Sequence, residues 1–417
     1  MKILWVKAGG LVPPNLGGRI RSYQILRQLA TKHDVTLFTF YAAQPNDAHA
    51  ELATFFHEVV YWPLSIASDK GFRELFSFAR HVFRSWPYSV CKYCRREVIA
   101  GMRQLLSKKW YDVILCDFVI AASAIPWEIA CPKVLFTHNV EALIWHQHAK
   151  VSRNPLWKFI CWREYKKMTQ FERFCLEKSQ HVLAVSEADR TFFGRFIDLA
   201  KITVVPTGVD TEYFYPTPVA ERPDSLVFTG AMDWMPNEDG VLYFVRSILP
   251  LIRKEVPDVS LSIVGRNPSR KLRAAVAYEQ RVEVTGNVED IRPYVQHSAV
   301  YVVPLRIGGG TRLKIFEAMA MGKPIVSTTL GAEGLPVSEG RHLLIADSPQ
   351  EFARTVVSLL RNPKQKACLG SAARRLVEKD YSWRAVAAEF DAVLRRVVEE
   401  QQTLSGASQG FSNRDRP

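Results

Sequence analysis

A triple glycine, Gly308–Gly310, stands between an apolar strand and a predicted helix. The helix should start near Thr311 and stop at Gly322, because a glycine followed by a proline is usual punctuation at a helix C-terminus. Glycines before a helix N-terminus let backbone N–H groups approach an anion closely, and the helix dipole favours negative charge there. The segment therefore has the residue types of a phosphate-binding turn, with Gly309, Gly310 and Thr311 as candidate contacts.

Two cations and a carboxylate follow the glycines. Arg312 and Lys314 are predicted in the first helical turn, where the dipole disfavours positive charge, and a bound phosphate would explain their presence. Glu317 lies three residues after Lys314 on a neighbouring face. A carboxylate there can accept hydrogen bonds from two sugar hydroxyls at once. An ordinary turn with solvated charges is the alternative, and the run as a whole favours a phosphate- and sugar-binding site.

Short apolar segments alternate with helical patterns through the first half of the chain. They are rich in Val, Ile, Leu and Phe without polar alternation, as expected for strands buried on both faces. Helical patterns such as Arg19–Lys32 and Glu97–Lys108 fall between them, and this βαβα order predicts a parallel, doubly wound sheet. The predicted strands are Lys2–Val6, Val35–Phe40, Val59–Tyr61, Val113–Cys116, Val134–Thr137 and Val182–Val185.

A second sheet is predicted after a linker. The segment Val204–Asp224 holds four prolines and little helical periodicity, and βα alternation restarts after it. Two doubly wound domains around one linker would place their strand C-termini across a cleft, where ligands of open α/β sheets bind. The second group of predicted strands is Leu226–Thr229, Leu261–Val264, Val282–Thr285, Val300–Pro304 and Ile325–Thr328.

These patterns divide the chain into five regions. Residues 1–206 and 225–380 are predicted to form two Rossmann-like α/β domains, joined by a linker at 207–224. Residues 381–400 are expected to form a C-terminal helix that returns to the first domain. Residues 401–417 are rich in Gln, Ser and Gly, so we expect a disordered tail there.

The composition is that of an ordinary globular protein of two or three domains. The chain has 417 residues, of which 47% are hydrophobic and 23% charged, which argues against disorder, collagen-like repeats and a small disulfide scaffold. No segment approaches the ~18–20 apolar residues of a membrane span, and the N-terminus reads as a buried strand, not a signal peptide. Of seven cysteines only Cys91 and Cys94 form a CxxC pair, without partners for a zinc site, and all seven fit a reducing cytosol.

Positive charge is concentrated in the first half. The 55 Lys and Arg residues against 42 Asp and Glu give a net charge of +13. Residues 1–210 hold 28 cations and 18 anions, a net of +10, whereas residues 211–417 hold 27 and 24, a net of +3. Such a surplus suits a phosphorylated ligand, an acidic membrane or nucleic acid. A merely basic soluble protein is the alternative.

Two stretches of the first half combine cations with aromatic residues. In Lys70–Arg96, seven basic residues and one acidic residue accompany apolar residues at helical spacing, among them Phe72 and Phe76. Such a helix could lie at a membrane surface or pack its apolar face on the domain's own sheet. In Leu143–Phe174, tryptophans are mixed with Lys and Arg, and we interpret this stretch as core or interdomain packing.

The run after the triple glycine resembles the family-4 retaining glycosyltransferases of GT-B fold. Their hallmark is Glu, seven residues, Glu, followed by Ala-Met-Ala, a Gly, a Pro and a strand. Glu317 is followed by Ala-Met-Ala, and Gly322 and Pro324 stand at the matching places, but Gly309 replaces the first Glu. GGGTRLK before the second Glu resembles one branch of that family. The resemblance implies that Glu317 holds the nucleotide ribose, and it gives no residue for the first Glu's contact with the donor sugar.

Two further sites near predicted strand ends match the family. Gly17 and Gly18 follow the first strand, where the family has a Gly-Gly opening a helix beside the donor phosphate and acceptor. His138 follows a strand in VLFTHNVE, where the family often has a His lining the cleft near the transferred sugar. The resemblance thus implies donor binding by Gly17 and Gly18 and a catalytic role for His138. A plain tight turn and a structural histidine are the respective alternatives.

One departure from the family concerns the donor diphosphate. The family usually places an Arg and a Lys after the first strand of the second domain to grip it, but Ala231 stands at the Arg position and no Lys follows. Arg312 and Lys314 are therefore the first candidates to bind the diphosphate and stabilise its charge during catalysis, and Arg266 is a weaker third. Such cations stabilise developing charge electrostatically.

The resemblance implies a retaining glycosyltransferase without a cofactor. It would take a sugar from a nucleotide-sugar donor on the second domain and pass it to a lipid-linked or growing surface glycan on the basic first domain. Front-face displacement would let the leaving phosphate oxygen help deprotonate the acceptor, so no protein nucleophile is required. GT-B enzymes generally work without a metal, and no DxD-like motif stands at a predicted strand end. We expect a cytoplasmic protein in peripheral contact with an anionic membrane, and no nucleic-acid partner.

Two other functions remain open. A nucleotide-sugar epimerase shares the GT-B architecture but needs no acceptor, so its products would form from donor alone. A non-enzymatic nucleic-acid-binding protein would use the basic charge, but the chain has no recognisable motif of that class, and charge alone is weak support.

Overall fold

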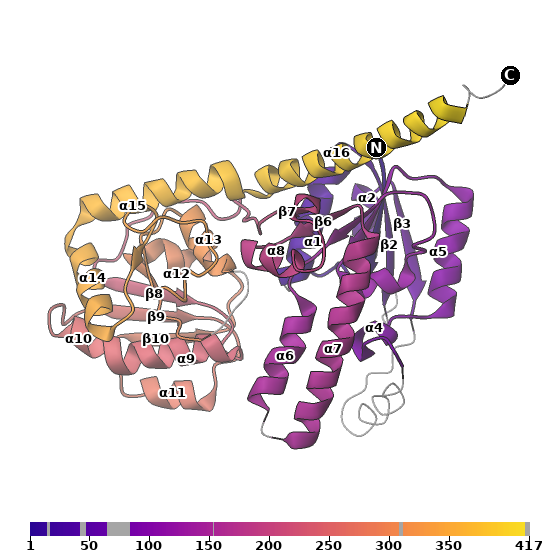
Figure 1. Ribbon diagram of the computed structural model, residues 1–417. Helices are drawn as coiled ribbons and strands as arrows, with labels where there is room; N and C mark the ends of the chain where they lie inside the picture. The colour runs from indigo at the N-terminus through magenta and orange to yellow at the C-terminus, as the bar shows by residue number, and fades with distance from the viewer. Residues whose placement is uncertain (15–16, 42–46, 65–83, 153, 308–311, 413–417) are drawn as a thin grey trace. The chain divides into compact units, whose positions relative to one another are not determined.

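The chain forms two units, each built on its own parallel sheet. The computed structural model describes residues 1–14, 17–41, 47–64, 84–152, 154–307 and 312–412 (Figure 1). Unit 1 comprises Met1–Pro206 together with the chain from Ala387 onward, and unit 2 comprises Thr207–Val386.

Unit 1 contains a seven-stranded sheet in the order β3-β2-β1-β4-β5-β6-β7, with all neighbouring strands parallel. The order reverses between β1 and β4, which is the topological switch point where open α/β sheets bind ligands. All six strands predicted for this half are present, whereas β7 was too short to show a pattern. The strands are β1 (Lys2–Ala8), β2 (Asp34–Tyr41), β3 (Glu58–Pro63), β4 (Val113–Asp117), β5 (Lys133–Phe136), β6 (His181–Ala184) and β7 (Ile202–Val204).

Helices connect these strands, and two of them form a long hairpin. The hairpin, α6 with α7, extends away from the sheet of unit 1 (Figure 1). The helices are α1 (Gly17–Ala30), α2 (Asp47–Phe55), α4 (Tyr88–Cys91), α5 (Arg96–Lys108), η1 (Val119–Ala124), α6 (Glu141–Val151), α7 (Pro155–Lys178), α8 (Glu187–Phe193) and η2 (Leu199–Lys201).

The C-terminal helix α16 (Trp383–Ser412) completes the core of unit 1. The Phe390 ring stacks on Trp5 with centroids 5.7 Å apart and meets Phe136 edge-on at 5.0 Å. His33 Nε2 lies 2.7 Å from Asp391 Oδ1, in a pair that is almost wholly buried. Our expectation for the tail differs from the structure, because α16 continues past Glu400 through the Gln-, Ser- and Gly-rich residues to Ser412.

Unit 2 contains a six-stranded sheet in the order β10-β9-β8-β11-β12-β13, again parallel throughout. Its switch point lies between β8 and β11. The five predicted strands are present, and the two-residue β13 was not predicted. The strands are β8 (Ser225–Thr229), β9 (Ser260–Val264), β10 (Val282–Gly286), β11 (Val300–Val303), β12 (Ile325–Ser327) and β13 (Leu344–Ile345).

The helices of unit 2 surround a core of buried aliphatic and aromatic residues. A π-helical turn, η3, joins α9 to α10, and a second one, η4, follows α15. The helices are α9 (Met235–Tyr243), η3 (Phe244–Ile248), α10 (Leu249–Arg253), α11 (Arg270–Val276), α12 (Arg292–His297), α13 (Leu313–Ala320), α14 (Pro349–Arg361), α15 (Pro363–Leu376) and η4 (Val377–Tyr381).

The predicted linker is tied to unit 2 by hydrogen bonds. Arg374 on α15 donates to the carbonyl oxygens of Thr211 at 3.0 Å and Phe214 at 2.6 Å. The Val209 amide donates to Tyr381 O at 2.7 Å. The segment after Pro206 therefore belongs to the packed body of unit 2.

Two predictions concern membranes: a basic amphipathic helix within Lys70–Arg96, and the absence of a membrane-spanning segment. Most of the basic aromatic segment Lys70–Arg96, including its apolar stripe, lies outside the described residues, and only 84–96 are described, with α4 among them. No helix within the described ranges is both long enough and apolar enough to cross a bilayer.

Candidate functional site

The predicted residues of unit 1 come together at the carboxyl end of its sheet. β5 ends at Phe136, and His138 follows two residues later. A Cβ built on Gly18, in the first turn of α1, would lie 3.6 Å from His138 Cδ2, whereas one built on Gly17 would meet no atom within 4 Å. The first turn of α1 therefore passes directly over the imidazole, and Gly17 leaves open space beside it.

A buried polar network holds His138, and our sequence analysis missed it. His138 Nε2 lies 2.8 Å from Asp117 Oδ1, the last residue of β4. Asp117 Oδ2 accepts hydrogen bonds from Lys7 Nζ at 2.9 Å and Trp5 Nε1 at 2.8 Å. Lys7 and Asp117 are register partners on β1 and β4. A signal for this network existed, since charged residues near the carboxyl ends of adjacent parallel strands must share one sheet edge.

The network favours a neutral imidazole beside an ionised carboxylate. Burial alone would raise the pKa of Asp117, but Lys7 and the hydrogen bond from His138 outweigh it and hold that pKa below its usual range. Burial lowers the pKa of His138 to about 4, against the opposing effect of Asp117. Because a carboxylate only accepts hydrogen bonds, the imidazole proton sits on Nε2.

The other ring nitrogen of His138 then presents a lone pair. His138 Nδ1 is buried and has no hydrogen-bond partner among the described residues. A buried acceptor without a donor is costly, so its pairing by a ligand hydroxyl would be favourable. Within the described residues, His138 Nδ1 is therefore an unpaired acceptor near the carboxyl end of this sheet.

Arg21 fixes the backbone in front of His138. It lies in α1 and is almost wholly buried, and its guanidinium donates to Thr137 O at 2.7 Å and also to Val205 O. The guanidinium also covers the Phe136 ring, 4.4 Å from its centroid. Burial lowers the pKa of Arg21 to about 9, with Asp117 opposing. Arg21 thereby ties the end of β5 to α1 and the chain after β7.

In unit 2, Lys314 reaches the end of β8. Its Nζ donates to Asn237 Oδ1 at 2.6 Å, and Asn237 Nδ2 donates to Ala231 O at 2.8 Å. A Cβ built on Gly230 would lie 2.7 Å from Lys314 Nζ. The ammonium from α13 thus occupies the neighbourhood of Ala231, the position at which the family has its first diphosphate-binding cation.

Burial shifts Lys314 and Glu317 toward their neutral forms. Both keep some accessible surface, but surrounding protein desolvates them. Burial lowers the pKa of Lys314 to about 7, opposed by Glu317, and raises the pKa of Glu317 to about 7, opposed by Lys314. An anion bound beside Lys314 would favour its charged form, so ligand binding and protonation are coupled here.

Arg312 lies differently from our prediction. Helix α13 begins at Leu313, so Arg312 precedes the first turn. Its side chain is largely buried, and Nη2 donates to Leu330 O at 2.9 Å, in the loop after β12. Burial lowers the pKa of Arg312, with Glu333 opposing. Arg312 therefore ties the N-terminal end of α13 to the loop after β12.

The remaining predicted residues of unit 2 lie around the same strand ends. Arg266 follows β9, and its exposed guanidinium lies 3.9 Å from Asp233 Oδ2. The β8 and β9 loops touch closely, since a Cβ on Gly265 would lie 1.8 Å from Gly230 O, a contact that only glycine permits. Gly309, Gly310 and Thr311 lie outside the described residues.

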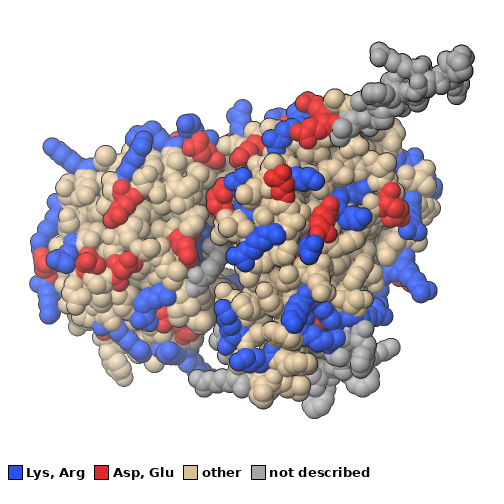
Figure 2. Space-filling view, viewed as in Figure 1, with Lys and Arg blue, Asp and Glu red and all other residues tan. Residues whose placement is uncertain are grey.

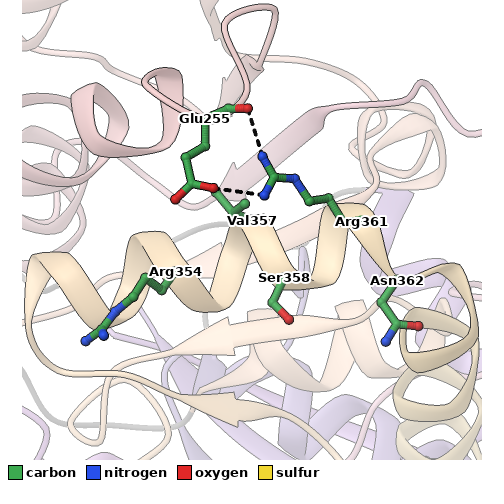
Figure 3. Close-up of a pocket in the computed structure, with 6 residues that line it drawn as sticks. All are labelled: Glu255, Arg354, Val357, Ser358, Arg361 and Asn362. Carbon is green, nitrogen blue, oxygen red and sulfur yellow. Dashed lines mark hydrogen bonds and ion pairs between the residues drawn. The ribbon is translucent and has the colours of Figure 1, made fainter.

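A separate hollow in unit 2 contains none of these residues. It runs along α14 and is lined by Glu255, Arg354, Val357, Ser358, Arg361 and Asn362 (Figure 3). The Arg361 guanidinium donates to both the side chain and the carbonyl oxygen of Glu255, at 2.9 and 3.1 Å. Its most central cation is thus already neutralised by a carboxylate.

Comparisons with known proteins agree with this architecture. Residues 17–213 match the family described as Glycosyltransferase Family 4, and residues 223–362 match Glycosyl transferases group 1. A GDP-mannose-dependent monoacylated alpha-(1-6)-phosphatidylinositol monomannoside mannosyltransferase of Corynebacterium glutamicum is 22% identical over 408 residues, which cover 92% of this chain and 95% of that relative.

Solved structures share the whole architecture at low sequence identity. Sucrose-phosphate synthase from Thermosynechococcus elongatus has a TM-score of 0.67 and 16% identity, with 96% of this chain and 99% of that chain covered. HepE of Anabaena, in complex with UDP, has a TM-score of 0.65 and 15% identity, with 95% and 100% covered. The fold is therefore GT-B. With the family matches to both units, this makes the protein a glycosyltransferase of GT-B fold.

Proposed function

We propose that this protein is a retaining glycosyltransferase that takes a sugar from a nucleoside-diphosphate donor bound by unit 2. The observation that carries the proposal is the position of Lys314, whose ammonium lies beside Gly230 and is held by Asn237 at the end of β8. Ligands of open α/β sheets bind at this edge. HepE, a structural relative, was solved with UDP, which supports a nucleotide donor. We also assign the chain to the branch with GGGTRLK before the second Glu.

The donor contacts follow from unit 2. Lys314 neutralises the diphosphate, and Glu317 accepts hydrogen bonds from the two ribose hydroxyls. The turn with Gly309, Gly310 and Thr311 supplies backbone N–H groups to a phosphate. Arg312, held by its hydrogen bond to Leu330 O, adds charge, and Arg266 is the outermost cation of the group.

The transfer step is a front-face displacement. The bond between the sugar C1 and the diphosphate oxygen breaks as the acceptor oxygen bonds to C1 on the same face. The acceptor proton passes to the leaving phosphate oxygen, so no protein nucleophile takes part. Charge on the diphosphate grows during this step, and Lys314 stabilises it most when it is greatest. His138, with Gly17 and Gly18 beside it, accepts a hydrogen bond from the transferred sugar through Nδ1.

The acceptor in this proposal is a lipid-linked or growing surface glycan, and unit 1 carries it at an anionic cytoplasmic membrane. The net charge of +10 over residues 1–210 supports the anionic surface. The Corynebacterium relative is named for a phosphatidylinositol mannoside acceptor, which supports a lipid-linked substrate. No nucleic-acid partner and no cofactor are part of this proposal.

A thermal-shift screen with nucleotide sugars tests the donor, because a bound donor stabilises the native state by mass action. The stabilising donor is then incubated with and without lipid-linked glycan acceptors, and the products and their anomeric configuration are determined. The proposal expects an acceptor-dependent product that keeps the donor configuration. A new nucleotide sugar formed from donor alone would instead indicate an epimerase.

A further inference from the structure

The free end of the α6–α7 hairpin exposes large apolar side chains. Leu156, Phe159 and Trp162 are 64%, 59% and 45% exposed, all in the first half of α7. The second half of the same helix is different, since Phe171 and Cys175 are buried in the core of unit 1. The apolar residues at the free end thus contribute little to the fold of unit 1, and we call Leu156, Phe159 and Trp162 the hairpin tip.

The hairpin tip is held in a fixed geometry. The Asn154 side chain accepts hydrogen bonds from the Leu156 and Trp157 amides at 3.0 and 3.2 Å, and Pro155 occupies the first turn, so α7 has a well-defined start. The Phe159 and Trp162 rings stack at 6.4 Å. At the other end of the hairpin, Glu172 accepts from the Glu141 amide at 2.8 Å. The exposed Phe159 and Trp162 rings therefore lie on a helix whose position is fixed at both ends of the hairpin.

Only positive charge accompanies these residues. Residues 142–163 contain Lys150, Arg153, Lys158 and Arg163 and no Asp or Glu. Lys166 Nζ lies 3.8 Å from the centre of the Trp162 ring, so its ammonium makes a cation–π contact with the exposed indole. Figure 2 shows uncharged side chains at the lower end of this region with Lys and Arg beside them.

We infer that the hairpin tip docks on an anionic lipid surface, with Leu156, Phe159 and Trp162 inserted at the headgroup level and the neighbouring cations on the lipid phosphates. The combination of Trp, Phe and Leu with Lys and Arg, free of acidic residues, matches the interface of a bilayer, where amphipathic rings and basic stems are favoured. The core of a protein–protein interface is instead depleted in Lys, whereas the exposed Lys150, Lys158 and Lys166 lie along this hairpin. This inference rests on the proposed membrane location of unit 1, and it names the surface that makes the contact.

Vesicle co-sedimentation of the full chain tests the inference without donor or acceptor. Phosphatidylcholine vesicles, with or without added phosphatidylglycerol, are compared at low and high salt. We expect binding only with phosphatidylglycerol, weakening as salt rises. Phe159→Ser and Trp162→Ser should each reduce the affinity roughly tenfold, as expected from the loss of a partly inserted aromatic side chain. Lys158→Ser should reduce it by about fivefold.

The matched control is Tyr278→Ser, which removes an aromatic residue that is 98% exposed in unit 2 and should leave binding unchanged. Two outcomes would overturn the inference. In the first, the tip variants bind as the parent does, while neutralising Arg73, Arg80 and Arg84 of the basic aromatic segment Lys70–Arg96 abolishes binding. In the second, the parent forms a dimer that the tip variants dissociate, with no change in vesicle binding.

Turnover separates this inference from the proposed function. Phe159→Ser and Trp162→Ser should transfer sugar to a detergent-dispersed acceptor at the parental rate, because the hairpin tip contains no donor-binding residue. Lys314→Met should bind vesicles as the parent does while turnover falls. Loss of vesicle binding alone therefore bears on the tip, and loss of turnover alone bears on the transferase proposal.

Discussion

Asp117 Oδ1 and His138 Nε2 lie 2.8 Å apart at adjacent strand ends, although the residues are separated by 21 positions in the chain. The same carboxylate holds Lys7 and Trp5, so the position and the tautomer of the imidazole are fixed by β1 and β4. This makes Asp117 a positioning residue for the proposed contact between His138 and the transferred sugar.

Replacing Asp117 with Asn should lower kcat roughly 10–100-fold, the range for losing a hydrogen bond to a charged group. An amide donates as well as accepts, so it no longer fixes the proton on Nε2. The tautomer can be read from the imidazole nitrogen shifts by NMR. Asp391→Asn is the matched control, because it alters the other buried His–Asp pair of unit 1 and should lower stability with turnover per folded molecule retained. If Asp117→Asn and Asp391→Asn showed equal turnover per folded molecule, Asp117 would not be a positioning residue for His138.

The buried state of His138 predicts an acid-sensitive fold. Its pKa is about 4 in the folded protein and about 6.5 when unfolded, so between these values the unfolded chain binds more protons. The free energy of unfolding should therefore fall as pH drops from about 6.5 to about 4, by at most about 3 kcal/mol from this residue. Urea unfolding at both ends of this window, for the parent and for His138→Gln, measures the difference. If the free energy of unfolding of His138→Gln depended on pH as that of the parent does, His138 would not contribute to the acid sensitivity.

Glu317→Ala should weaken nucleoside and nucleoside diphosphate binding alike, by about 1–3 kcal/mol. The lost interaction is with the ribose, so the affinity for inorganic pyrophosphate should change less than the affinity for the nucleoside. Calorimetric titration of a folded variant with all three ligands checks this. Unchanged nucleoside affinity would place the ribose elsewhere.

Arg312→Lys should lower the free energy of unfolding of unit 2 by about 1–2 kcal/mol, because the hydrogen bond to Leu330 O is lost while the charge is kept. Arg306→Lys is a matched control, because Arg306 also lies between β11 and α13 but is half-exposed and paired with Asp239. Its effect on unfolding should be within about 0.5 kcal/mol. Equal stability of the two variants would mean that the hydrogen bond from Arg312 to Leu330 O does not stabilise the start of α13.

The strands were predictable because a parallel sheet buries both faces of each strand, which leaves continuous apolar runs such as Val113–Cys116. The charged residues at the ends of β1 and β4 signalled a polar network, but the pairing of Asp117 with Lys7 also required the strand order, and chain order does not reveal that β1 lies between β2 and β4. The role of Arg312 depends on a carbonyl of Leu330, 18 residues away.

The α6–α7 hairpin shows that the spacing of aromatic residues in the sequence does not predict which of them are buried. Our interpretation of Leu143–Phe174 as core or interdomain packing fits Trp145 and Tyr165, which pack on the core of unit 1, whereas the core of unit 1 leaves Trp162 45% exposed. A helical spacing of aromatic residues reveals a face, and it does not reveal whether protein covers that face.

The most direct test of the account is calorimetric titration of nucleoside and nucleoside diphosphate into the parent, Lys314→Met and Lys314→Arg, at about pH 7 and about pH 9. The free parent should lose its Lys314 proton across this range, so its diphosphate affinity should fall by up to about tenfold per pH unit. The nucleoside serves as the control for the effect of Glu317 titration on ribose binding. Lys314→Met should bind the diphosphate roughly 10–100-fold more weakly at pH 7 and without this pH dependence, whereas Lys314→Arg should keep its charge throughout. Diphosphate affinity within about twofold of the parent in Lys314→Met, with the same pH dependence, would contradict the account.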